Sequence, residues 1–193
     1  MKRSVSLRIA WFLIGLFLIW QATGCQSLFA PPVNIQLSEE ENQILIEHSF
    51  NPPYIVRWPD GAVITVYDET NFIHLDYVLN EWNKCLEGKV TLVKTDNPNG
   101  AKVKIIYEES GGDWAGTAFT YYNWDNIITS GLIKIDKNYG YEIDTYLHEF
   151  GHVLGCHQHL EKGLMGGGGN SIDDYTCWFF RLLYSLPIGY SLK

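Results

Sequence analysis

Two histidines, His148 and His152, lie four residues apart, and Glu149 directly follows the first of them in the stretch HEFGH. In an α-helix this spacing puts both imidazoles on one face, one turn apart, so that both can reach a single metal ion. Glu149 could then act as general base toward a water bound to that metal. Zinc lowers the pKa of such a water to about 7. The pattern therefore predicts metal-assisted hydrolysis.

The same histidines could instead be ordinary residues of a helix, because HExxH also arises by chance. At roughly 100° per residue, the apolar residues of this segment form a narrow stripe, which consists of Ile143, Leu147, Phe150 and Leu154. Both histidines point more than about 90° away from that stripe, so they do not belong to a buried seam. A pair of exposed surface histidines is the simpler alternative.

The residues that follow favour a metal site. Gly151 lies inside the helix, where glycine costs up to roughly 1 kcal/mol relative to alanine, so we expect another group to approach the backbone closely there. Gly155 stands where a left-handed residue can end the helix. His157 and His159 come next and could supply a third ligand, and Met165 precedes four glycines.

The stretch HEFGHVLGCHQH, with the leucine–methionine pair beyond it, resembles the metzincin metallopeptidases and, within them, the matrixin-like group. The family pattern is HExxHxxGxxH, followed by a short loop and a methionine turn beneath the metal. His148, Glu149, His152, Gly155 and Met165 match it position by position. The resemblance implies a zinc endopeptidase with one catalytic zinc ion (Zn2+) and a protein or peptide substrate. It covers the order of elements from about residue 54 to the end.

One position departs from the family pattern. The third histidine of the family falls on residue 158, which is Gln158 here, and a glutamine oxygen is a poor zinc ligand beside imidazole. The third ligand is therefore His159 or His157, through a shift of one residue after Gly155. We favour His159, because an extra residue is easier to loop out than a missing one is to span. A further alternative is that the site is impaired.

The elements that must position these residues alternate along the chain. Runs of β-branched residues predict strands, and apolar residues at helical spacing predict helices. The expected strands are 62–67, 89–94, 102–107, 116–122 and 132–135, and the expected helices are 72–86, 142–154 and 172–186. The expected fold class is α+β (α/β-type), a single metzincin-like domain with a twisted mixed sheet of about five strands and three helices. The active-site helix carries HExxH.

The N-terminus is typical of a targeting segment. Basic residues precede an apolar run over 9–20, which is shorter than the roughly 20 residues of a membrane span but typical of a signal peptide. Ala22-Thr23-Gly24-Cys25 resembles a bacterial lipobox, in which the cysteine is lipidated. An ordinary signal peptide and an uncleaved anchor are the alternatives.

We therefore expect a lipoprotein-type signal peptide at 1–24, a lipidated Cys25 and tether at 25–52, and the metallopeptidase domain at 53–193. The protein would be exported and held at the cell envelope, at an outer membrane or cell surface, or else secreted. Export permits a disulfide. We expect Cys156 to pair with Cys177, because the two flank the site, and Cys85 to be left over.

Composition limits the partners. The formal net charge is -8, and no Lys/Arg cluster occurs beyond the first eight residues, so nucleic acid is not expected. A second, structural zinc is not expected either, because residues 108–126 contain no histidine. Residues 108–113 could hold calcium, but a solvated acidic turn is the preferred interpretation.

Three hypotheses of function follow from these patterns. The first is a membrane-tethered zinc endopeptidase. The second, motivated by Gln158, is a catalytically impaired lipoprotein of the same fold that acts as a binding or structural protein. The third and weakest is a zinc hydrolase that acts on a substrate other than a peptide. The oligomeric state does not follow from the sequence.

Overall fold

The computed structural model describes residues 35–138 and 142–193. Five strands and four α-helices form these residues, where the sequence predicted about five strands and three helices. In chain order the elements are α2 (Glu39–His48), β1 (Ala62–Asp68), α3 (Leu75–Leu86), β2 (Val90–Lys94), β3 (Val103–Glu108), β4 (Gly116–Tyr122), β5 (Ile128–Asp136), α4 (Ile143–Leu154), the 3-10 turn η1 (Leu164–Gly166) and α5 (Asp174–Ser185). The predicted α+β class is confirmed.

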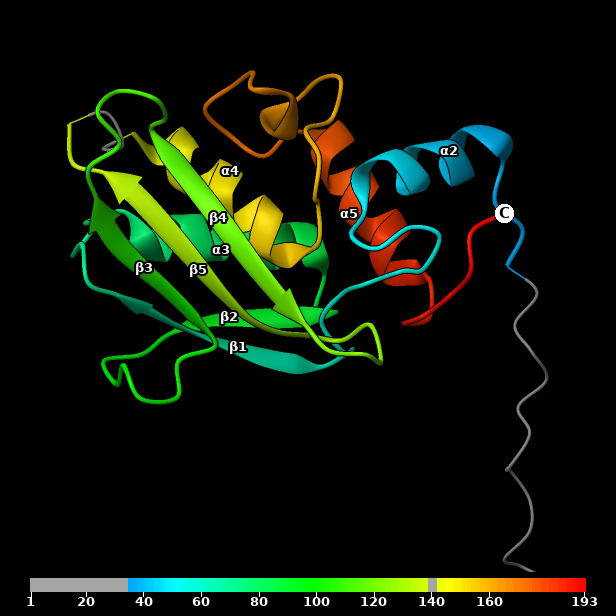
Figure 1. Cartoon of the computed structure of the whole chain (residues 1–193), viewed down its shortest axis with the longest axis horizontal. Coiled ribbons are helices and arrows are strands. Elements are labelled where there is room, and N and C mark those ends of the chain that lie inside the picture. Colours follow the sequence, from blue (N-terminus) through cyan, green and yellow to red (C-terminus); the bar gives the residue numbers. More distant parts are fainter. Residues whose placement is uncertain (1–34, 139–141) are drawn as a thin grey trace, which may run out of the picture. The chain divides into compact units, whose positions relative to one another are not determined.

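The five strands form one mixed sheet in the order β2-β1-β3-β5-β4. β1 pairs in parallel with β2 and with β3, and β3 pairs in parallel with β5. Parallel neighbours need a crossover connection, and α3 provides it between β1 and β2 (Figure 1). β4 runs antiparallel to β5 and is the last strand on its side of the sheet.

The core lies between this sheet and the two helices α3 and α4, which contact each other and cover the same face (Figure 1). Because side chains alternate along a strand, β1 turns Ile64 and Val66 inward, and both are fully buried. Its neighbour Val63 faces the other way and is 50% exposed. From α4, Leu147 and Phe150 pack into the same core with no exposed surface.

Helix α2 corrects the expectation that residues 25–52 form only a tether. Its N-terminus carries a capping box, in which Glu41 N–H donates to the Ser38 hydroxyl and Ser38 N–H donates to the Glu41 carboxylate. This S-x-x-E signal was readable in the sequence but was overlooked. Leu45 is fully buried, so the helix packs on the domain that follows it.

The disulfide also differs from the expected one. Cys85, at the end of α3, pairs with Cys177 in α5, and their Cα atoms are 5.3 Å apart, a separation that suits a disulfide. Cys156 is a free, buried cysteine, and its thiol donates a hydrogen bond to the carbonyl of Gln158. The prediction of a Cys156–Cys177 pair was wrong, because α5 packs against α3 and this packing brings Cys85 to Cys177.

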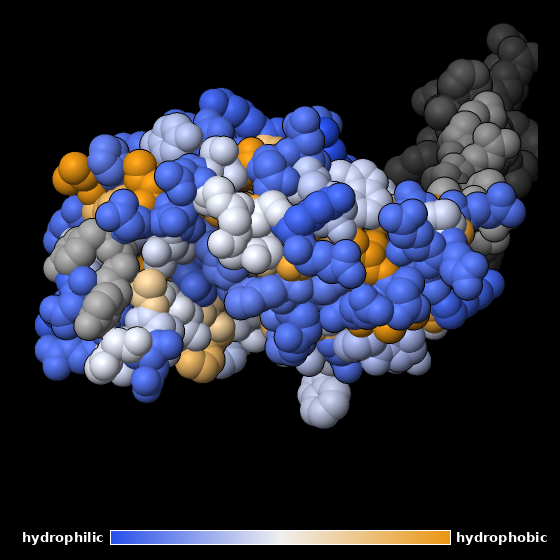
Figure 2. Space-filling model, turned by 90° about the horizontal axis from the view of Figure 1, so that it is seen from above, coloured by the Kyte–Doolittle hydropathy of each residue, from blue (hydrophilic) through white to orange (hydrophobic). Residues whose placement is uncertain are grey.

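The predicted signal peptide and the predicted lipidation site Cys25 lie outside the described residues. Among the residues that are described, no helix is both long enough and apolar enough to cross a membrane. The face in Figure 2 is mainly hydrophilic, and its apolar residues form small separate patches.

Candidate metal centre

Helix α4 carries two of the three imidazoles that meet at the candidate metal centre. His148 and His152 lie one turn apart, and their Nε2 atoms are 3.2 Å from each other. The Nε2 atom of His159, which follows the helix, lies 3.1 Å from that of His148. The ligand atoms of all three residues lie within 4.8 Å of one another. The three rings therefore point their nitrogens at one position.

Backbone carbonyls orient the two helical imidazoles. His148 Nδ1 lies 2.9 Å from the carbonyl oxygen of Leu164, and His152 Nδ1 lies 2.7 Å from that of Cys156. A carbonyl can only accept, so each Nδ1 must carry the proton and donate. The Nε2 lone pair of each ring is then free for a metal ion, as is usual for ligating histidines.

Burial keeps these two imidazoles neutral. Burial lowers the pKa of His152 to about 4, although its hydrogen bond to the Cys156 carbonyl acts in the opposite direction. Burial also lowers the pKa of His148, against the effect of its bond to Leu164. A neutral imidazole is the form that binds a metal, so little proton release is needed at neutral pH.

The loop after α4 decides which of its side chains reach the centre. Gly155 ends the helix at φ 129°, a backbone conformation that favours glycine. Beyond it, His157 N–H donates to the carbonyl of His48 at 2.6 Å, and the ring of His157 packs against Phe50 with 4.6 Å between centroids. His159 joins the other two imidazoles, whereas His157 and the exposed Gln158 do not.

Gly151 lets Met165 lie directly against the metal helix. A Cβ atom at Gly151 would overlap the Met165 sulfur and would stand 2.8 Å from its Cε. Met165 is fully buried. The expectation of a close neighbour at this glycine is thus confirmed, and the neighbour is the methionine of η1.

Glu149 is a buried carboxyl group beside the imidazole cluster. The residue is 5% exposed, and its Oε2 atom has no hydrogen-bond partner among the described residues. Burial raises the pKa of Glu149 to about 8. A Cβ atom at Gly116 in β4 would stand 2.8 Å from Glu149 Cγ, so this glycine allows the carboxyl group to lie against the strand.

Side chains from other elements donate to carbonyls in the last turn of α4, where intrahelical partners become scarce; the His152 carbonyl also accepts from Gly155 N–H. Trp58 Nε1–H donates to the Val153 carbonyl at 2.8 Å, and the Tyr184 hydroxyl donates to the Leu154 carbonyl at 2.9 Å. The Thr120 hydroxyl of β4 donates to the His152 carbonyl at 3.0 Å. These bonds hold the last turn of α4, and with it His152.

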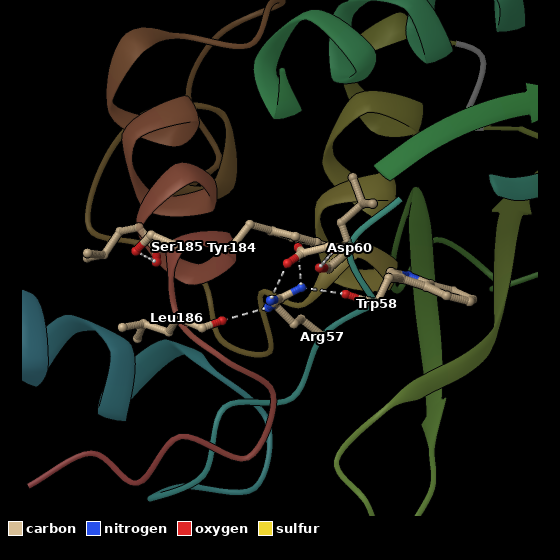
Figure 3. A network of polar contacts seen from close by, with 8 residues as sticks. Arg57, Trp58, Asp60, Tyr184, Ser185 and Leu186 are labelled. Carbon is tan, nitrogen blue, oxygen red and sulfur yellow. Dashed lines mark hydrogen bonds and ion pairs between the residues drawn. The ribbon is translucent and has the colours of Figure 1, made fainter. Parts of the chain in front are cut away.

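A buried arginine holds Trp58 and α5 together at this end of α4 (Figure 3). The Arg57 guanidinium donates to the carbonyls of Trp58 and Leu186 and forms an ion pair with Asp60. It also lies over the Tyr184 ring, 5.2 Å from the centroid. The cluster stands away from the imidazoles, and its contacts are structural.

Asp173 connects η1 to α5, and it was not among the site residues predicted from the sequence. Its Oδ1 atom accepts from the backbone N–H groups of Tyr175 and Thr176, as an N-cap residue does. Its Oδ2 atom accepts from Leu164 N–H at 2.7 Å. Since the Leu164 carbonyl orients His148, Asp173 acts on that ligand through one intervening residue. Its position before a helical pattern was the signal available in the sequence.

Two hollows open beside the imidazoles and share Gly116, Glu149 and His159 in their walls. One of about 320 Å³ lies toward Leu164 and the glycines after Met165. The other, of about 530 Å³, lies between β4 and the loop after α4, with Phe50 in its wall. The candidate centre therefore stands between two open spaces, and both are accessible to a ligand.

This donor set fits a metal ion. Three neutral imidazole nitrogens suit zinc and several other transition metals, and carbonyl partners on the Nδ1 side are the usual supporting contacts. Glu149 lines both hollows together with His159 and does not belong to the three-nitrogen group. The three histidines could hold a metal ion, and Glu149 is placed to act beside it.

Comparison with known proteins does not assign this chain to a family. No protein-family model matches the sequence, and no curated protein matches it. Among solved structures, the crystal structure of myroilysin is similar at 17% sequence identity and a TM-score of 0.36. That match covers 65% of this chain and spans 58% of the myroilysin chain. A likeness of this size decides neither family nor activity.

Proposed function

We propose that this chain is a zinc-dependent endopeptidase of the metzincin, matrixin-like type. His148, His152 and His159 hold the ion, and Glu149 is the general base. One arrangement carries the proposal: three converging imidazole nitrogens in an open cleft, with the largely buried carboxyl group of Glu149 in the wall of the same cleft. Three protein ligands with an open position are typical of catalytic zinc sites, whereas structural sites have four.

Glu149 is the group that accepts and then donates the proton in the proposed reaction. When bound, zinc supplies Lewis acidity toward the substrate carbonyl and toward water. Without a cation nearby, burial holds the pKa of Glu149 at about 8, and an adjacent positive charge favours the carboxylate form. Glu149 then takes a proton from the attacking water and passes it to the amine nitrogen of the leaving group.

The edge of the sheet supports a peptide as substrate. β4 pairs only with β5 among the described strands, so the backbone groups on its other edge are available. An extended peptide can add to such an edge by main-chain hydrogen bonds. Since Gly116 of β4 lies against Glu149, a peptide bound there would pass the general base.

The competing proposal is a binding or structural protein of the same fold. It depended on Gln158, which stands at the position where the family pattern has its third histidine. His159 weakens that argument, because a third imidazole is available where a third ligand is needed. The hydrolysis of a substrate other than a peptide has no comparable support, since the edge strand favours an extended chain.

The decisive test compares the wild type with Glu149→Ala, using residues 26–193, for zinc content and for cleavage of a generic unfolded protein. We expect one zinc per chain in both proteins. Cleavage by Glu149→Ala should fall by roughly 10²- to 10⁴-fold, the usual contribution of a general base. Glu161→Ala, an exposed acid outside both hollows, is the matched control and should cleave normally. Stoichiometric zinc with background cleavage in all three proteins would favour the binding protein.

We further propose that the enzyme is exported and held at the cell envelope by a lipid on Cys25. The proposal rests on the basic, apolar and small-residue pattern of residues 1–25. The substrate would then be a protein or peptide outside the cytoplasm.

A further inference from the structure

The larger hollow beside the metal centre has an aromatic side wall. Phe50, just beyond α2, is half-buried and lines this hollow together with His157. The two rings are 4.6 Å apart between centroids and inclined by 38°. Tyr122 supports Phe50 from another side, with 6.0 Å between centroids. Phe50 and His157 therefore form this wall from two separate parts of the chain, and Tyr122 contacts Phe50 without lining the hollow itself.

Strand β4 forms another wall of this hollow. Its residues 116–121 line the hollow. Gly116 lies against Glu149, and Thr120 bonds to the His152 carbonyl. Near the end of β4 the pairing with β5 skips Thr129, because Tyr121 pairs with Ser130 and Tyr122 pairs with Ile128. The strand and the two rings are thus walls of the same hollow.

The aromatic wall is continuous with the proposed active site. Glu149, His152 and His159 line the same hollow of about 530 Å³ as Phe50 and His157. A peptide paired with the free edge of β4 would place alternate side chains toward the same surface. One of these side chains would meet the ring of Phe50.

We propose that Phe50 and His157 form a specificity subsite for a large apolar side chain of the substrate, with an aromatic one preferred. The inference rests on the proposed peptidase function and names a feature of its substrates. Aromatic rings pack favourably in offset or edge-to-face pairs, and the half-buried face of Phe50 offers such a contact. The subsite also gives a role to His157, which does not join the three imidazoles.

The experiment uses the full chain and a set of fluorogenic peptides. The peptides are identical except for phenylalanine or alanine at one position, which is moved in turn through the residues on both sides of the cleaved bond. We expect the wild type to prefer phenylalanine at one position by about tenfold in kcat/KM, the scale of burying one large apolar side chain. In Phe50→Ala this preference should fall to about twofold. Phe50→Leu, which keeps an apolar side chain, should give an intermediate value.

Tyr77→Ala is the matched control, because Tyr77 is an aromatic residue on α3 that is 43% exposed and lies outside both hollows. It should keep the wild-type preference. An unchanged preference in Phe50→Ala and Phe50→Leu, at normal zinc content, would overturn the subsite. A wild type without any preference for phenylalanine would overturn it as well.

A binding measurement separates failure of the subsite from failure of the peptidase proposal. In Glu149→Gln, which should bind peptides without cleaving them, the phenylalanine peptide should bind more tightly than its alanine counterpart. Adding Phe50→Ala should remove most of that difference. If the wild type cleaves no peptide but this difference is found, the peptidase proposal fails and the subsite stands. If the two peptides bind equally, the subsite fails whatever the activity.

Discussion

His157 and His159 are separated by one residue but face different parts of the cleft. His159 Nε2 lies 3.1 Å from His148 Nε2, whereas the His157 ring lies against Phe50. Gln158, between them, is exposed. Side chains of successive residues in an extended segment point to opposite sides, so residues two apart would share a side if the loop were regular. The bond from His157 N–H to His48 shows that the loop is held by outside contacts instead.

This difference gives a prediction for metal binding. His159→Ala should weaken zinc binding by more than about 100-fold, because removal of a ligand exceeds the 10- to 100-fold cost of losing a supporting contact. His157→Ala is the matched control and should bind zinc as the wild type does. Competition with a chromogenic chelator measures both affinities, and circular dichroism checks that both variants fold. Loss of zinc in His157→Ala alone would assign the third ligand to His157.

Helix α4 is the element on which the proposed chemistry depends, and its neighbours hold it from several sides. Trp82 Nε1–H donates to the Leu147 carbonyl at 3.0 Å, and Met165 lies against Gly151. Met165 belongs to η1, which in turn depends on the N-terminus of α5 through Asp173. The proposed ligand His148 is therefore supported by three elements beyond its own helix.

Asp173→Ala should destabilise the fold by about 1–3 kcal/mol at pH 7, since it removes a helix cap and the partner of Leu164 N–H. Partial burial acts to raise the pKa of Asp173, but hydrogen bonds from Thr176 and Leu164 outweigh it and lower that pKa. The stabilisation is therefore fully present above the unfolded value of about 3.9. It is lost as the pH falls through the lower, folded value.

Urea unfolding of the wild type and Asp173→Ala between pH 7 and pH 2 measures this dependence. The difference in free energy of unfolding should be constant down to about pH 5 and shrink below about pH 4. Asp174→Ala, which removes an exposed acid at the next position, should change stability by less than about 0.5 kcal/mol. A difference that grows on acidification would contradict the role given to Asp173.

Backbone hydrogen bonds join residues 53–55 to the C-terminal segment at residues 190–192. Ile55 N–H donates to the Tyr190 carbonyl at 3.0 Å, and Leu192 N–H donates to the Pro53 carbonyl at 2.8 Å. The disulfide adds a covalent link between α3 and α5. Helix α2 packs on the same folded unit through the buried Leu45, so the tether predicted for residues 25–52 would end before residue 39.

Lipidation of Cys25 is a prediction for the whole chain in its cell. Expression in bacteria with a radiolabelled fatty acid should label the wild type and place it in the membrane fraction. Cys25→Ser should carry no label, because a serine cannot form the thioether, and should leave the membrane fraction once the lipid is absent. Ser27→Ala is the matched control and should be labelled normally. A label that persists in Cys25→Ser would contradict the prediction that Cys25 is the lipidated residue.

The strands, helix α4 and the two imidazoles that it carries could be predicted from the sequence because their signals are local. The side-chain positions of His148 and His152 follow from the turn of one helix, and strands such as 62–67 and 116–122 follow from residue type. The need for a close neighbour at Gly151 could also be anticipated, since glycine inside a helix is costly.

Contacts between distant segments decided the rest. The loop after α4 is held by His48, which lies far earlier in the chain, so the local argument could favour His159 over His157 but could not decide between them. The partner of Cys177 depended on how α3 packs on α5. Phe50 comes from the segment after α2, whereas the other walls of the larger hollow come from β4, α4 and the loop after α4. Local geometry made the pairing of His148 with His152 on one helix face predictable from residue spacing, whereas the approach of His159 and the walls of the cleft depend on packing between segments that are far apart in the sequence.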